Sequence, residues 1–155
     1  MKLKENSKAP KFSSVDEDGN KVSLADFKGN WLVLYSYPKD NTSGCTIEAI
    51  DFTKLMPKFS KLGAKVVGIS KDSCASHKDF IRGKKLKVTL LADETMEVQK
   101  AFGVWRMKKF MGREFLGTVR STFLINPEGK IAKIWDDVKA EGHAKEVLAT
   151  LSEIV

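Results

Sequence analysis

The sequence predicts an α/β fold in which a central mixed β-sheet is flanked by helices, with a β-hairpin at the N-terminus. Short apolar runs typical of buried strands alternate with segments whose apolar residues recur at helical spacing. Near the C-terminus, two further strand-like runs flank a turn sequence and form a second hairpin. Strands that alternate with helices and then pair as a hairpin indicate a sheet that helices cover on both faces.

In the first 63 residues we expect a small hairpin over 12–23, a helical turn over 24–27 and a buried strand over 31–37. A helix follows, and its first turn contains Cys45. Its apolar residues at helical spacing are Phe52, Leu55, Met56, Phe59 and Leu62. Pro57 lies inside this pattern, where it lacks an N–H and clashes with the preceding turn, so we expect a kink or break near Met56.

The rest of the chain continues the alternation. Strands are predicted over 65–70, 88–92, 119–125 and 131–135. Helices are predicted over 96–102, over 143–154 and from an N-cap at Asp72 or Ser73 to about Gly83. Residues 103–117 are predicted to be a loop, and the last helix is predicted to be amphipathic. No repeat or linker divides the sequence, so residues 1–155 are predicted to form a single domain.

Composition excludes several classes of protein. No apolar run is long enough to span a membrane, and the first ten residues lack the apolar core of a signal peptide. The net charge of +7 is spread along the chain rather than gathered in a block, which argues against a nucleic-acid partner. His77 and His143 lack metal-ligand spacing, so we interpret both as structural or surface residues. Two cysteines do not make a disulfide scaffold, and we expect a cytoplasmic protein.

Cys45 is the candidate reactive residue. It follows a buried strand and a loop, and Thr42 and Ser43 are good N-cap residues for the next helix. The first helical turn has unpaired N–H groups and the positive end of the helix dipole, and both favour a thiolate. Because the thiolate is the nucleophilic form of cysteine, this position indicates a reactive sulfur rather than a buried core cysteine.

Pro38, Thr42 and Cys45 match the Pro-x-x-x-Thr-x-x-Cys motif of the peroxiredoxins, and the stretch 37–49 resembles the peroxiredoxin Q, or bacterioferritin comigratory protein, group. The resemblance continues through residues 67–77 and 117–126 and covers nearly the whole chain. It implies a thioredoxin-like fold and a thiol-dependent peroxidase that reduces hydrogen peroxide and organic hydroperoxides. It implies no cofactor and no metal.

The resemblance also implies roles for individual residues. Cys45 would attack the peroxide and become a sulfenic acid, and Thr42 would place a hydroxyl beside the sulfur. Arg120 would stabilise the thiolate and orient the peroxide from a distant strand. Pro38 would fix the loop and shield the sulfur. Glu48, one turn after Cys45, would bind Arg120 or reach back to the helix start, with a surface role equally open.

The chain departs from the family at the resolving cysteine. Many relatives have one five residues after the peroxidatic cysteine, where this chain has Ile50, and others have one near the position of Ile81. Cys74 is the only other thiol, and it follows a strand expected to lie parallel to the strand before Cys45. Two cycles therefore stay open: resolution by Cys74 after local unfolding, or a one-cysteine cycle with an external thiol.

The expected partners are peroxide substrates and thioredoxin or another thiol reductant, and the expected state is a monomer, with a weak dimer as the alternative. A thiol–disulfide oxidoreductase is disfavoured because Glu48 stands where a Cys-x-x-Cys motif would have its second cysteine. A redox sensor or binding module that uses Cys45 as a switch, with little turnover, is the alternative function.

Overall fold

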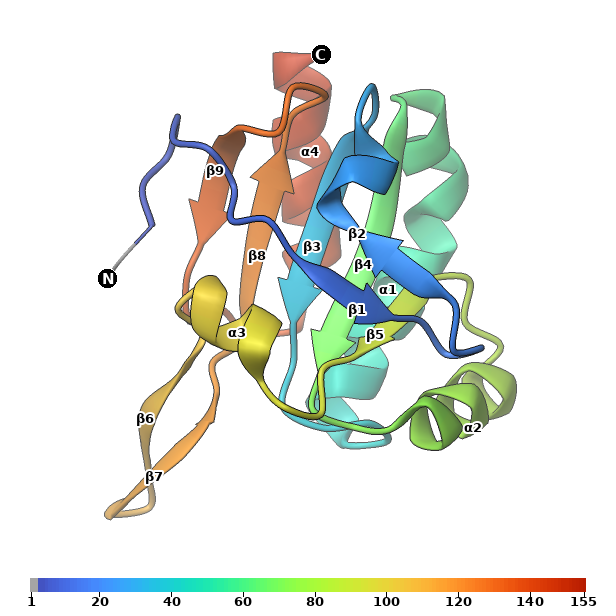
Figure 1. The fold of residues 1–155 in the computed structure, drawn as a ribbon. Helices are drawn as coiled ribbons and strands as arrows, with labels where there is room; N and C mark the ends of the chain where they lie inside the picture. Colours follow the sequence, from blue (N-terminus) through green and yellow to red (C-terminus); the bar gives the residue numbers. More distant parts are fainter. Residues whose placement is uncertain (1–2) are drawn as a thin grey trace.

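The computed structural model describes residues 3–155, and its centre is a five-stranded mixed sheet of order β5-β4-β3-β8-β9 (Figure 1). The central strand β3 lies parallel to β4, which lies parallel to β5, whereas β8 and β9 are antiparallel to their neighbours. The strands are β3 (Trp31–Ser36), β4 (Ala64–Ser70), β5 (Thr89–Ala92), β8 (Ser121–Ile125) and β9 (Ile131–Trp135). The predicted mixed α/β architecture is confirmed.

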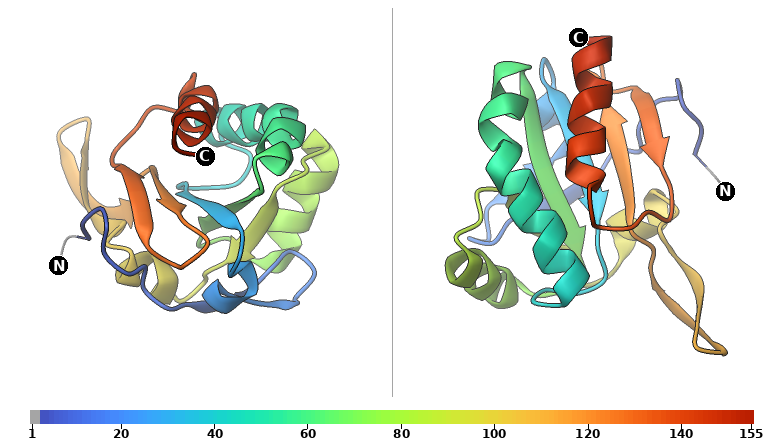
Figure 2. Two further views of the ribbon diagram at one scale, coloured as in Figure 1. Left: turned by 90° about the horizontal axis from the view of Figure 1, so that it is seen from above. Right: turned by 180° about the vertical axis from the view of Figure 1, so that it is seen from behind.

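Helices and short elements cover both faces of the sheet (Figure 2). On one face lie α1 (Ser43–Lys61) and α4 (His143–Ile154), and α2 (Cys74–Lys84) lies beside β5. The other face carries the 3₁₀ turn η1 (Leu24–Phe27), α3 (Glu97–Ala101) and the predicted N-terminal hairpin of β1 (Ser13–Val15) and β2 (Lys21–Ser23). The sheet therefore has two hydrophobic interfaces.

The central strand β3 shows how the two interfaces arise. Successive side chains of a strand point to opposite faces, and those of β3 are almost wholly buried. Val33 and Tyr35 pack in one cluster with Phe52 of α1, whereas Leu32 and Leu34 pack in the other. A strand that is apolar on both faces is typical of a parallel strand between two helical layers.

Of the predicted kink or break at Pro57, the break is wrong, because α1 continues to Lys61 and ends at the C-cap Leu62, and the kink stays a prediction. Pro57 is exposed, so water can satisfy the backbone carbonyl that loses its helical partner. Phe52 and Phe59, on either side of the proline, are fully buried. Their packing against the sheet outweighs the local cost of the proline.

The predicted loop over residues 103–117 is also wrong, because this segment forms the hairpin of β6 (Trp105–Phe110) and β7 (Arg113–Thr118). Met111 and Gly112 connect the strands, and both have positive φ, at 52° and 78°, as a type I′ turn requires. Methionine is an unusual residue at the first of these positions, and basic residues interrupt the apolar pattern of β6. The sequence therefore lacks the usual hairpin signal.

The fold places two loops at one edge of the sheet. Because β3 and β4 are parallel neighbours in register, with Tyr35 opposite Gly68, the loops that follow them leave from the same carboxyl edge. The first loop leads into α1 and the second into α2.

Among the described residues, no helix combines the length and apolarity that crossing a membrane demands.

We expect Gly68→Ala to lower the free energy of unfolding by about 1–3 kcal/mol, the usual cost of overpacking a core. A Cβ atom at Gly68 would lie 2.7 Å from Cζ of the buried Tyr35 and 2.9 Å from Cδ2 of Leu90. Gly83→Ala in α2 is the matched control, because nothing lies within 4 Å of its Cβ position. Urea denaturation should show the control unchanged or up to about 1 kcal/mol more stable; equal stability of the two variants would contradict this packing.

Candidate active site

Cys45 is the third residue of α1 and is only 1% exposed. The loop from the end of β3 delivers it to the carboxyl edge of the sheet, and Thr42 is the N-cap residue of the helix. The sulfur therefore lies in the first helical turn, where unpaired backbone N–H groups and the helix dipole stabilise negative charge. Burial excludes bulk water from this sulfur and strengthens nearby electrostatic interactions.

Thr42 and Pro38 shape the loop that leads to Cys45. The Thr42 hydroxyl donates a hydrogen bond of 2.7 Å to the carbonyl of Lys39, which closes the loop on itself. It makes no side-chain bond to the helix start. Pro38 is half-buried within the loop. The structure thus gives both residues a part in loop shape, and the role of the Thr42 hydroxyl beside the sulfur stays a prediction.

Arg120 meets Cys45 as predicted. It lies between β7 and β8, and its Nη2 donates to Cys45 Sγ at 3.4 Å. Its backbone carbonyl accepts from Val138 N–H at 2.8 Å, which fixes the segment. A Cβ atom at residue 44 would lie 3.1 Å from Arg120 Nη2, so Gly44 leaves the space that the guanidinium occupies.

Glu48 holds the other side of the guanidinium. Arg120 Nη1 donates to Glu48 Oε1 at 2.6 Å, and the Glu48 side chain is completely buried. The prediction that Glu48 binds Arg120 is confirmed, and the alternative of a surface role is wrong. The signal in the sequence was the helical spacing, because Glu48 lies on the same side of α1 as Cys45 and Phe52.

Burial shifts the pKa values of Glu48 and Arg120 in opposite directions. Burial raises the pKa of Glu48 from 4.5 to about 7, although Arg120 works to lower it. Burial lowers the pKa of Arg120, but Glu48 and Cys45 outweigh this effect and the pKa is raised overall. Arg120 therefore stays charged. Glu48 Oε2 is buried without a described hydrogen-bond partner, which fits a carboxyl group that exchanges a proton near neutral pH.

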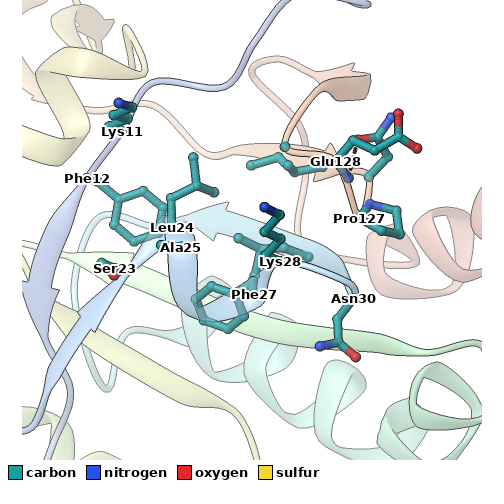
Figure 3. A pocket seen from close by; sticks show the side chains of 14 residues that line it. Lys11, Phe12, Ser23, Leu24, Ala25, Phe27, Lys28, Asn30, Pro127 and Glu128 are labelled. Carbon is teal, nitrogen blue, oxygen red and sulfur yellow. Dashed lines mark hydrogen bonds between the residues drawn. The ribbon is translucent and has the colours of Figure 1, made fainter.

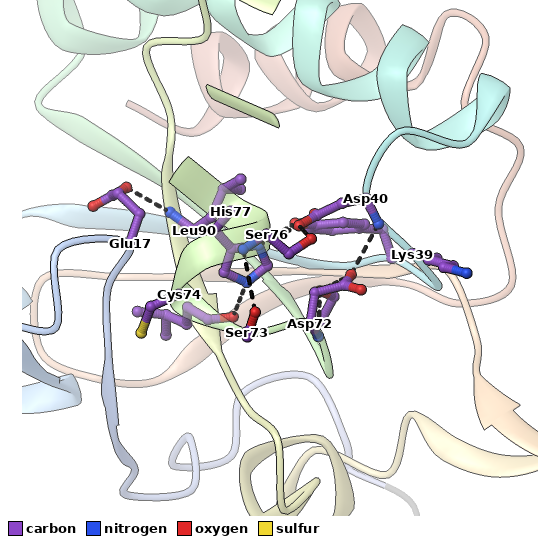
Figure 4. A network of polar contacts seen from close by, with 12 residues as sticks. Glu17, Lys39, Asp40, Asp72, Ser73, Cys74, Ser76, His77 and Leu90 are labelled. Carbon is purple, nitrogen blue, oxygen red and sulfur yellow. Dashed lines mark hydrogen bonds and ion pairs between the residues drawn. The ribbon is translucent and has the colours of Figure 1, made fainter. Parts of the chain in front are cut away.

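A buried polar network lies beneath the loop between β3 and α1 (Figure 4). Asp40 accepts hydrogen bonds from the hydroxyl groups of Tyr37, at 2.6 Å, and Ser76, at 2.8 Å. Its carboxylate also contacts Nδ1 of His77 at 2.7 Å, while its backbone N–H donates to Asp72 Oδ2 at 2.8 Å. The network joins the loop before Cys45 to the start of α2.

His77 is fully buried within this network. Its Nε2 lies 2.9 Å from the carbonyl of Leu91, which can only accept, so both ring nitrogens face acceptor oxygens. Burial lowers the pKa of His77, but the bond to Asp40, the Asp40 charge and the bond to the Leu91 carbonyl together outweigh burial, and the pKa is raised overall. The structural role predicted for His77 is confirmed and the surface role is wrong. Its helical spacing from the apolar Phe80 and Ile81 could have located it on the buried face of α2.

The Asp40, Asp72 and His77 side chains also offer ligand atoms within 4.8 Å of one another, as a metal ion would need. Each already has hydrogen-bond partners, which account for the cluster without an ion. His143 is likewise buried, and its Nε2 lies 2.7 Å from the Thr122 hydroxyl. We interpret it as a structural residue.

Cys74 is the first residue of α2, at the same edge of the sheet as Cys45. Both cysteines are free, and Cys74 is half-buried. Its Sγ donates to the carbonyl of Asp16 at 3.3 Å, and in Figure 4 its side chain points away from Asp40. The structure confirms the predicted edge but turns this thiol toward the N-terminal hairpin.

A cavity of about 470 Å³ lies at the start of β3, the end of that strand away from Cys45, and Asn30 is among its lining residues (Figure 3). Phe12, Leu24 and Phe27 line it together with the turn that contains Pro127. Its lining includes neither cysteine and neither Arg120 nor Glu48. The chemical groups of this chain are therefore gathered at the Cys45 edge, away from this cavity.

Comparisons with known proteins agree with this site. Residues 6–134 match the AhpC/TSA family. Peroxiredoxin Bcp of Bacillus subtilis is 42% identical over 99% of this chain and 98% of its own length, and Peroxiredoxin Bcp of Escherichia coli is 42% identical over 97% of each. The bacterioferritin comigratory protein of Xanthomonas campestris, solved in a study of its alkyl peroxide reduction activity, has a TM-score of 0.87 and 41% identity over 92% of this chain and 90% of its own.

We expect Glu48→Gln to remove a pH dependence from the stability of the protein. The folded protein holds the Glu48 proton more tightly than the unfolded chain does, because the folded pKa is about 7 rather than 4.5. The stability from this proton is complete below pH 4.5 and is lost as the pH rises through about 7. The free energy of unfolding of the variant, relative to wild type, should therefore rise by up to about 3 kcal/mol between pH 4.5 and 8.

Urea denaturation at a series of pH values measures this difference. The surface variant Glu94→Gln is the control and should run parallel to wild type, since the Glu94 side chain is exposed. A Glu48→Gln curve parallel to wild type over the whole range would contradict the raised pKa.

Proposed function

The chain belongs to the AhpC/TSA family and is a thiol-dependent peroxidase of the peroxiredoxin type, and we propose that Cys45 supplies the reacting thiol. The observation that carries the proposal is the contact of 3.4 Å between Arg120 Nη2 and Cys45 Sγ at the start of α1. A fixed positive charge and a helix N-terminus meet at one sulfur. Both stabilise negative charge at this position, and the thiolate is the form of cysteine that attacks a peroxide.

In the proposed reaction, the Cys45 thiolate attacks one oxygen of the peroxide. A sulfur–oxygen bond forms as the O–O bond breaks, and Cys45 is oxidised by two electrons to a sulfenic acid. The other oxygen leaves with the electron pair of the broken bond and takes up a proton, which gives water from hydrogen peroxide or an alcohol from an organic hydroperoxide. Negative charge thus moves from sulfur to the leaving oxygen.

Arg120 is placed to follow that movement of charge. Its Nη2 faces the sulfur, while the bond from Nη1 to Glu48 Oε1 prevents the guanidinium from turning away. Donors fixed in advance where charge develops stabilise a transition state without reorganising. Arg120 therefore acts on the reacting atoms, and Glu48 is a positioning residue.

Recycling of the sulfenic acid requires a second thiol. A sulfenic acid condenses with a thiol to give a disulfide and water, and a dithiol reductant then returns both sulfurs to thiols. Ile50 excludes the disulfide within α1. We assign the second thiol to Cys74, because β3 and β4 are parallel neighbours and deliver both cysteines to one edge of the sheet.

That step needs a local opening of the structure. Cys45 is buried, and Cys74 is bonded to the carbonyl of Asp16. The bonds of Asp40 to Ser76 and His77 tie the two loops together, so they must break before the sulfurs meet. The opening involves helix starts rather than the sheet, and such segments open at lower cost than the core.

Thioredoxin is the reductant that we propose, acting on a monomer in the cytoplasm. The low cysteine content supports a reducing compartment, since the chain has two cysteines and both are free. A reductant that carries two thiols can resolve either a Cys45–Cys74 disulfide or a mixed disulfide. The reductant, the monomeric state and the cytoplasmic compartment are thus proposed together, on the basis of the thiol chemistry of the site.

Arg120→Ala should slow the oxidation of Cys45 by on the order of 10²–10³, the usual cost of removing a fixed donor at a reacting centre. Stopped-flow measurement with hydrogen peroxide gives this rate, and Cys45→Ser should abolish peroxide consumption. Arg82→Ala, which removes an exposed arginine from the last turn of α2, should react at the wild-type rate. An Arg120→Ala variant that reacts as fast as wild type would rule out the proposed role.

One equivalent of peroxide should produce a Cys45–Cys74 disulfide within single chains, detected by mass spectrometry of a non-reduced peptide digest. Cys74→Ser should instead retain the sulfenic acid and progress to higher oxidation at Cys45. Wild-type protein that keeps a free Cys74 while Cys45 is oxidised would show a one-cysteine cycle served by an external thiol.

A further inference from the structure

The β6–β7 hairpin has no role in the chemistry described so far, yet it has an unusual surface. It projects from the body of the protein below α3 (Figure 1), and the view from behind shows it extending past the sheet (Figure 2). Of the eight large hydrophobic side chains described as exposed, five belong to this hairpin: Met107, Phe110, Met111, Phe115 and Leu116. A cluster of apolar side chains on a solvent-exposed surface marks a binding site.

The base of the hairpin is held firmly, so the exposed side chains are presented on a fixed support. The Thr118 hydroxyl donates to Oε1 of the buried Gln99, and Val119 N–H donates to the carbonyl of Val104 at 2.8 Å. Arg106 forms an ion pair of 2.7 Å with Asp136. The hairpin therefore emerges from the body at a defined point, two residues before Arg120.

One face of the hairpin is turned toward the active site. Arg106 reaches Asp136, and Lys108 Nζ donates to the carbonyl of Thr118 at 2.8 Å, two residues before Arg120. Side chains alternate along a strand, so Phe110 shares this face with Arg106 and Lys108. The cross-strand register adds Phe115, which pairs with Lys108.

The opposite face carries Met107 and Leu116, which pair with each other. The two faces thus differ in direction but not in apolar character, since Phe110 is 65% exposed and Leu116 58%. The hairpin itself provides matched positions for a test.

We propose that the Phe110–Phe115 face of the hairpin is the docking surface for the protein dithiol that reduces oxidised Cys45, an inference that rests on the peroxidase function proposed above. The reductant must bring its own thiol to a sulfur at this edge of the sheet, so it must bind beside Arg120. A small thiol needs no such surface, whereas a protein binds through an apolar centre with a charged rim.

The charge of the hairpin defines the chemistry of this partner. Residues 105–118 contain four basic side chains and one acidic side chain, Glu114. Arg113 pairs across the strands with Phe110, so it places positive charge beside the apolar face. The complementary partner has an apolar patch around its reactive cysteine and a net negative rim. A second copy of this chain would bring the same basic hairpin and would be repelled.

The test compares two reductants in steady-state peroxide consumption at saturating peroxide. The first is a bacterial thioredoxin supplied with NADPH and its reductase, and the second is dithiothreitol. We expect Phe110→Ser and Phe115→Ser each to raise the KM for thioredoxin about tenfold, as loss of an aromatic side chain from an interface does. Turnover with dithiothreitol and the rate of Cys45 oxidation should stay at wild-type values.

The charge of the hairpin and the choice of its binding face are each tested by a variant with its own control. Arg113→Glu should raise the KM for thioredoxin and reduce its dependence on salt, whereas Lys61→Glu, at the far end of α1 from Cys45, should leave the KM unchanged. Leu116→Ser, on the opposite face, should also leave it unchanged.

An unchanged KM in both phenylalanine variants would overturn the inference, as would an equal rise in Leu116→Ser. Wild-type protein that turns over with dithiothreitol but not with thioredoxin would overturn it while leaving the peroxidase function intact. Failure of the wild type with both reductants would instead refute the proposed function. Binding to phosphatidylglycerol vesicles that is lost in Phe110→Ser, with the KM for thioredoxin unaltered, would identify a membrane surface as the partner.

Discussion

The contact of Arg120 with both Cys45 and Glu48 is the interaction on which the site depends. A guanidinium can donate to two acceptors in fixed directions, so a single side chain both meets the sulfur and is locked by the carboxylate. The arrangement costs the protein the burial of Glu48, whose pKa of about 7 reflects that cost. Much of the architecture, including the antiparallel placement of β8 beside β3, brings these residues together.

A second constraint is that the same region must be both rigid and able to open. The Asp40–His77 pair and its hydroxyl partners fix the loop before Cys45, which keeps the sulfur in place for reaction with a peroxide. The same bonds hold the start of α2, where Cys74 lies. The network is cooperative, because the four side chains around Asp40 share its two carboxylate oxygens and its backbone N–H, so its bonds hold or open together.

Where the sequence interpretation failed, the cause was a competition between local preference and packing. Pro57 disfavours a helix locally, yet α1 continues because Phe52 and Phe59 bury their rings on either side of it. The β6–β7 hairpin lacks a usual turn residue at Met111 and a clean alternating pattern. Its strands pair only with each other and expose most of their apolar side chains. No buried face therefore imposes an alternating apolar pattern on their sequence.

Apart from β6 and β7, the sequence by itself determined the order of strands and helices, the position of Cys45 in a first helical turn and the residues of its loop, because these follow from local periodicity and capping. A resemblance in sequence pointed to Arg120. Only the tertiary structure decided that Glu48 is buried, that His77 is paired with Asp40 and that Cys74 is turned toward Asp16. These facts depend on which side chains meet across elements distant in the chain, and burial and pairing in three dimensions set their charge and exposure.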